Sequence, residues 1–100
     1  MARVLNTRGQ VLIRIDALEV VGHSGATVAR LEGRHLVNLN GQELAQVDGD
    51  GFRTIGGADY RIEGDDLLGP SGSVLGTVLG GNPNERALAA AAYVEFYGDG

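Results

Sequence analysis

Glycine is the feature that most constrains this chain, because 17 of its 100 residues are Gly and they recur at fixed intervals. One column comprises Gly9, Gly25, Gly41, Gly57 and Gly72, with equal intervals except that the last is shorter by one position. A second column falls half a period later and comprises Gly33, Gly49, Gly64 and Gly80, with Ala17 in the equivalent place of the first unit. Such regular spacing excludes disorder as the main explanation. It predicts five copies of one unit of about sixteen residues, the fourth copy being one position short.

Each half-unit predicts a short β-strand followed by a tight turn. Asn-Gly, Asp-Gly and Ser-Gly pairs supply the positive φ that hairpin turns require. Within the first strand of each unit, two apolar columns lie two positions apart and therefore on one face. They comprise Ile13, Ala29, Ala45, Tyr60 and Gly76, and then Ile15, Leu31, Val47, Ile62 and Val78. In four units the second strand also has an apolar residue, five positions after the second of these columns. These residues are Val20, Leu36, Phe52 and Leu67.

The predicted fold class is therefore mainly β. About ten short antiparallel strands in five hairpin repeats would form a small barrel or a strongly curved sheet. A parallel β-solenoid with one coil per period is the alternative, since a fixed period is also typical of solenoids. Turn signals such as Asn40-Gly41 favour the hairpins.

The opposite face of the first strands has an Arg-x-acid pattern. Its two columns comprise Arg14, Arg30, Gln46, Arg61 and Thr77, and then Asp16, Glu32, Asp48, Glu63 and Leu79. Arginines in a row can recognise phosphate, but an acidic residue accompanies nearly every Arg and cancels the field that a phosphate would feel. A solvated outer face with weak ion pairs is the favoured interpretation.

After residue 81 the sequence changes to a predicted helix over residues 82–97. Asn82 suits the N-cap, Pro83 the first helical position and Glu85 the third. From residue 87 to residue 94 every residue except Tyr93 is aliphatic, so this helix is apolar nearly all round and should be buried. We expect one domain over 1–100, with hairpin repeats over 1–81 and a helix enclosed by the sheet or plugging its mouth.

Repeated strand pairs with Asp-Gly and Asn-Gly turns, ending in the apolar helix NERALAAAAYVEFY, resemble the tubby, phospholipid-scramblase and LURP-one superfamily. The resemblance covers the whole chain, at about half the length usual for that superfamily. It implies a β-barrel that encloses a C-terminal hydrophobic helix and acts as a binding or scaffold module, in some members at phosphoinositide membranes. No residue of this chain matches the basic binding pocket of that superfamily. PRC-barrel domains are a second, weaker likeness.

Composition and charge narrow the classes of function. Eight basic and 13 acidic residues give a net charge of −5, which argues against nucleic acid and against contact with an anionic membrane surface. The absence of Cys removes disulfides and thiolate chemistry and is compatible with a reducing compartment. No apolar run resembles a signal peptide or approaches the length of a transmembrane helix. A cytoplasmic protein is the expectation.

No catalytic, cofactor-binding or metal-binding residue is predicted. His23 and Ser24 are adjacent, so on a strand they point to opposite faces and cannot form a nucleophile–base pair. His23 and His35 alone make a weak metal set. The acidic turns at residues 48–51 and 63–66 suit hairpins better than calcium, and the segment at 80–82 lacks the Lys of a phosphate-binding loop.

Aromatic residues near the end of the helix supply the candidate interaction surface, which comprises Tyr93, Phe96 and Tyr97. They would either form an apolar patch for a partner or close the core. The predicted function is a non-enzymatic structural or interaction module, forming a homodimer or binding a protein partner, because an incompletely closed sheet leaves edges to be paired. A small-molecule or lipid-binding barrel is the alternative, and an enzyme of unknown reaction is the third hypothesis.

Overall fold

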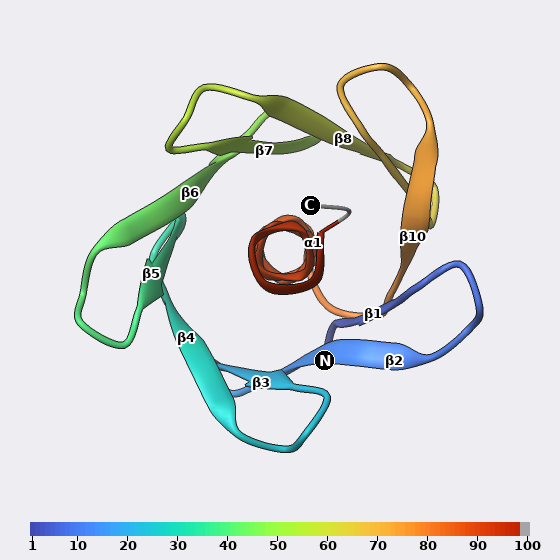
Figure 1. Cartoon of the computed structure of the whole chain (residues 1–100). Coiled ribbons are helices and arrows are strands. Elements are labelled where there is room, and N and C mark those ends of the chain that lie inside the picture. The colour runs from blue at the N-terminus through green and yellow to red at the C-terminus, as the bar shows by residue number, and fades with distance from the viewer. Residues whose placement is uncertain (99–100) are drawn as a thin grey trace.

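A computed structural model describes residues 1–98 and shows a closed ten-stranded antiparallel barrel with one helix inside it (Figure 1). The strands are β1 (Arg3–Leu5), β2 (Val11–Asp16), β3 (Glu19–Gly22), β4 (Thr27–Glu32), β5 (His35–Asn38), β6 (Glu43–Asp48), β7 (Gly51–Thr54), β8 (Asp59–Glu63), β9 (Asp66–Leu68) and β10 (Val74–Leu79). The helix is α1 (Pro83–Tyr97). The predicted fold class is confirmed, and antiparallel pairing throughout excludes the solenoid.

The fifth hairpin is assembled from the two ends of the repeat region. After β10 the chain turns at Gly80 and leaves for the helix, and β1 occupies the place of the missing strand. Val4 lies opposite Val78 as Val20 lies opposite Ile15 in the first complete hairpin. Every strand therefore has two neighbours, and the expectation of unpaired sheet edges is wrong.

The two glycine columns correspond to two kinds of turn. In the first column the glycine has φ between 83° and 93° and ends a short loop, as where the Gly9 N–H donates to the Asn6 carbonyl at 3.0 Å. Each residue of the second column is the first residue of a tight turn and has φ between 58° and 74°. Hairpin turns require a positive φ at this first position. Ala17 holds this position in the first unit at φ 58° and is the one non-glycine residue with positive φ among residues 1–98.

The fourth unit lacks a β-bulge that the other four units have. The bulged residue is apolar and packs partly buried against the core in each case, and these residues are Leu12, Val28, Leu44 and Leu75. The fourth unit lacks this residue, so β7 and β8 pair without a shift and Phe52 lies directly opposite Tyr60. Their rings stack with centroids 4.8 Å apart. The shorter spacing of the fourth unit thus reflects a missing bulge.

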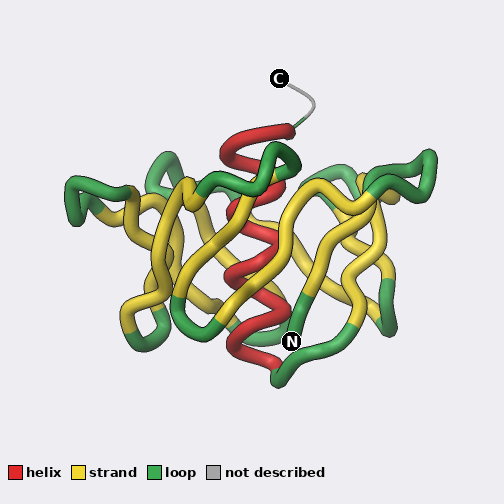
Figure 2. The backbone as a smooth tube through the Cα atoms, turned by 90° about the horizontal axis from the view of Figure 1, so that it is seen from below, coloured by secondary structure: helices red, strands yellow, loops and turns green. Residues whose placement is uncertain are grey.

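The helix α1 runs through the barrel between its two open ends (Figure 1, Figure 2). Asn82 and Glu85 form the predicted capping box. The Glu85 N–H donates to Asn82 Oδ1 at 2.8 Å. The Asn82 N–H donates to Glu85 Oε1 at 3.0 Å. All residues from 87 to 93 are buried against the inward columns of the strands, and the buried side chains of residues 1–98 are all hydrophobic. The predicted buried helix is confirmed.

We expect Gly51→Ala to destabilise the protein by about 1–3 kcal/mol in urea denaturation, as overpacking does. In the unbulged β7–β8 pair, a Cβ on Gly51 would lie far inside contact distance of the Tyr60 carbonyl oxygen. The matched control is Glu19→Ala at the equivalent exposed position of the first unit, which should cost within about 1 kcal/mol. Equal losses at the two positions would contradict this account of the fourth unit.

Candidate functional site

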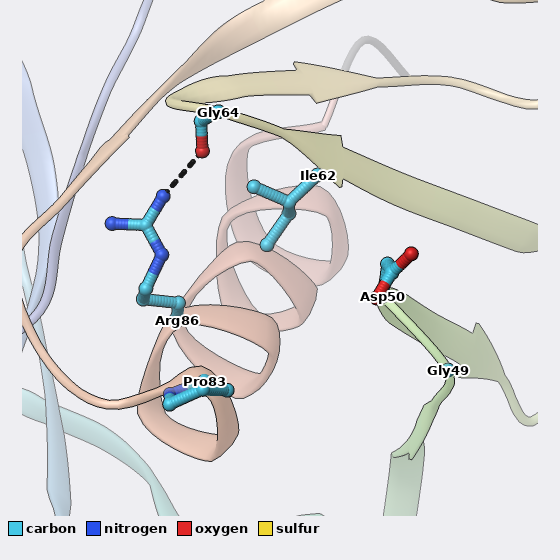
Figure 3. A pocket seen from close by; sticks show the side chains of 6 residues that line it. All are labelled: Gly49, Asp50, Ile62, Gly64, Pro83 and Arg86. Carbon is cyan, nitrogen blue, oxygen red and sulfur yellow. Dashed lines mark hydrogen bonds between the residues drawn. The ribbon is translucent and has the colours of Figure 1, made fainter.

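A cavity of about 180 Å³ opens at the mouth of the barrel where α1 begins (Figure 3). Turns of the second glycine column surround this N-terminal mouth. The cavity lies between the helix and the third and fourth units, and its lining comprises Gly49, Asp50, Ile62, Gly64, Pro83 and Arg86. Ile62 supplies an apolar wall that points toward the helix, and Arg86 is the one cation in the lining.

The Arg86 side chain is 19% exposed, and its hydrogen bonds go to the protein itself. Its Nη2 donates to the Gly64 carbonyl at 2.6 Å and to Asp65 Oδ1 at 3.2 Å. Asn84 Nδ2 makes a similar contact with another turn of the same mouth, donating to the Gly33 carbonyl at 2.9 Å. These contacts tie the first turns of the helix to the rim. They use the charge of Arg86 to hold the fold together, and the neighbouring carboxylate of Asp65 opposes the entry of an anion.

Replacing Arg86 by Gln should destabilise the protein by about 1–3 kcal/mol, because the Gly64 carbonyl loses its charged donor beside the cavity. Chemical denaturation measures this difference. The control is Arg61→Gln, which removes an exposed ion pair with Glu63 and should cost about 0–1 kcal/mol. If both variants lose the same stability, Arg86 does not fasten the helix to the rim.

The opposite end, the C-terminal mouth, contains the three aromatic residues of the candidate interaction surface. A cavity of about 270 Å³ there is lined by Thr7, Val74, Leu75, Tyr93, Val94, Tyr97 and Gly98. Tyr93 is buried and its hydroxyl donates to the Leu75 carbonyl at 3.0 Å. The Tyr97 hydroxyl accepts the His23 N–H at 2.9 Å and occupies the space that a side chain on Gly22 would need.

Phe96 is the most exposed of the three aromatic residues, at 39%. Tyr93 and Tyr97 contact the barrel itself, as the core-closing interpretation expects. A role in partner binding therefore stays a prediction, and within this set it applies chiefly to Phe96.

The two histidines lie in separate surroundings. His23 Nδ1 is 3.3 Å from the Val11 carbonyl, and His35 Nδ1 is 3.0 Å from Glu43 Oε1. Ser24 lies in the exposed turn after His23. Within residues 1–98, no three His, Asp or Glu side chains lie together in a group that could hold a metal ion.

Exposed ion pairs occupy part of the outer wall. Arg53 Nε donates to Asp59 Oδ1 at 2.8 Å across β7 and β8. This hydrogen bond lowers the pKa of Asp59 and raises the pKa of Arg53. Arg61 pairs with Glu63 on the same strand at 2.8 Å. These pairs fit the interpretation of a solvated face in the third and fourth units.

Comparisons of the chain with protein-family models, with curated proteins and with solved structures found no match. No helix within residues 1–98 combines the length and apolar character needed to cross a membrane. The resemblance to the tubby-like superfamily therefore stays a prediction. Function has to be argued from the geometry of the barrel itself.

Proposed function

We propose that this protein is a non-enzymatic interaction module whose outer wall binds a protein partner. The observation that supports this proposal is the occupant of the barrel. The chain's own helix, buried from residue 87 to residue 93, takes the place that a ligand holds in a ligand-binding barrel. Function is then left to the outer surface. The resemblance to the tubby-like superfamily implies the same kind of module, and the absence of Cys is compatible with the cytoplasmic location that we propose.

A small-molecule or lipid-binding barrel is less well supported. The two cavities at the mouths, about 180 and 270 Å³, fall below the roughly 300–1,000 Å³ of pockets that hold drug-sized ligands. The cavity at the C-terminal mouth combines the apolar side chains of Leu75 and Val94 with the Tyr97 hydroxyl, so of the two it is the better suited to such a ligand. A hollow of about 380 Å³ between β8 and the β9–β10 loop lies on the outer wall, where the charged side chains of Asp59 and Arg61 line it. An enzyme has still less support, since the ionisable groups with clearly shifted pKa values, Arg53 and Asp59, form an exposed ion pair.

Two apolar probes, anilinonaphthalene sulfonate and dodecanoate, distinguish the interaction module from a ligand-binding barrel. We expect neither the fluorescence of the dye nor the Tm of the protein to change on titration, because the helix fills the centre of the barrel and the cavities at the two mouths are small. Saturable binding by one molecule per chain would contradict the proposal if Leu75→Phe, which narrows the C-terminal mouth, abolished it. Ile55→Phe is the matched control, since Ile55 lies in the exposed β7–β8 turn and does not line that cavity.

A further inference from the structure

The outer face of β10 departs from the charge pattern of the other strands. At the two positions where the first strands of three other units have Arg and an acid, β10 has Thr77 and Leu79, both half-buried. Val74 at the start of β10 is 51% exposed. On the neighbouring strand β1, Leu5 lies opposite Thr77 and is also half-buried. A strip of low charge therefore runs along this side of the barrel.

Two arginines that form no ion pair among residues 1–98 lie on one side of this strip. Arg3 on β1 and Arg14 on β2 are direct partners across the two strands, and both are exposed. Like charges directly opposite each other destabilise a sheet, so this pair costs the isolated barrel stability. An external anionic group would offset that cost.

An acidic pair lies on the other side of the strip. Glu63 on β8 and Asp66 on β9 are direct partners and exposed. Glu63 is already bonded to Arg61 at 2.8 Å, whereas Asp66 makes no ion pair within residues 1–98. Asp66 lies opposite Thr77, and Arg3 lies opposite Leu79, so the basic and acidic residues flank β10 from its two neighbouring strands. Two strand spacings, about 10 Å, separate these flanks.

We propose that this β10 face, comprising Thr77, Leu79, Leu5, the Arg3–Arg14 pair and the Glu63–Asp66 pair, binds a second copy of the same chain. The inference rests on the proposed function and names its partner. A twofold symmetric contact requires a patch that is complementary to itself. An apolar centre with a basic flank and an acidic flank meets this requirement, because each arginine pair then faces the acidic pair of the other copy.

The charges also fix the orientation of the two copies. A twofold axis parallel to the barrel axis places the basic flank of one copy against the acidic flank of the other. A twofold axis perpendicular to the barrel axis would place like charges together. The two barrels therefore lie side by side with their C-terminal mouths on the same side, joined along β10, which Figure 1 shows at the outer wall between the two hairpin turns on either side.

Sedimentation equilibrium of the full chain tests the proposal through charge reversal. The wild-type protein should form a concentration-dependent dimer at about 0.1 M salt, where exposed charges still act over roughly 10 Å. The double variants R3E/R14E and E63R/D66R should each weaken it at least about tenfold, because both contacts of the dimer then oppose like charges. An equimolar mixture of the two variants should restore the dimer as a heterodimer, since every contact again joins opposite charges. Circular dichroism melting confirms that each variant is folded.

The matched control is R30E/R34E, which makes the same change in net charge as R3E/R14E on the β4 side of the barrel and should leave the dimer intact. A wild-type monomer up to millimolar concentration would overturn the proposal. So would equal weakening by the control, or a failure of the mixture to restore association. If inorganic phosphate bound to the arginine pair of such a monomer, Arg3 and Arg14 would instead be an anion site. A monomer that takes up neither apolar probe leaves the interaction module standing, whereas saturable probe binding that Leu75→Phe abolishes overturns that module whatever the dimer result.

Discussion

Burial of a helix that is apolar all round is the constraint on which the rest of the structure depends. A helix with one apolar stripe can rest on a sheet, but residues 87–93 of this chain need an apolar wall on every side. A closed barrel supplies that wall. The strands in turn need the helix, because a ten-stranded barrel without it would contain an apolar hole. Four consecutive alanines, residues 89–92, keep the helix slim enough for the wall to close around it.

Closure of the barrel follows from the same requirement. The helix has to enter the barrel directly after β10, so the chain cannot also form the strand that completes the fifth hairpin. β1 from the other end of the chain takes that place and pairs with β10 and β2. The Ile15 N–H donates to the Ala2 carbonyl at 2.9 Å, as the Leu31 N–H donates to the Leu18 carbonyl at 2.8 Å in the next unit. The first residues of the chain are thus as much part of the barrel as the repeats.

Much of this architecture could be predicted from the sequence because it depends on local chemistry. Glycine spacing located the turns, alternation located the inward columns, and the capping box located the start of the helix. The missing residue of the fourth unit was visible as a shorter spacing. The sequence did not reveal that the missing residue is the bulge residue, because this depends on the strand register. That register pairs Phe52 with Tyr60 and leaves no space for a side chain at Gly51.

Other features could not be predicted because they depend on contacts between distant segments. Arg86 bonds to the backbone carbonyl of Gly64, a partner that residue types do not reveal. Barrel closure by β1 was missed because Arg3–Leu5 is a single short strand outside the repeat columns. The departure of Thr77 and Leu79 from the outer columns was visible in the sequence. That these two residues lie between a basic and an acidic pair became apparent only from the pairing of β1 with β10.

Amide hydrogen exchange measures most directly whether helix and barrel form one inseparable unit. The amides of residues 90–93 should exchange with the same opening free energy as those of Ile15, Leu31 and Val78 on the wall, and this value should equal the global free energy of unfolding. That result means that the helix leaves the interior only when the barrel unfolds. Exchange of the helix amides at a clearly lower free energy, with the wall still protected, would contradict the account. The helix would then be a removable plug and the barrel a container for something else.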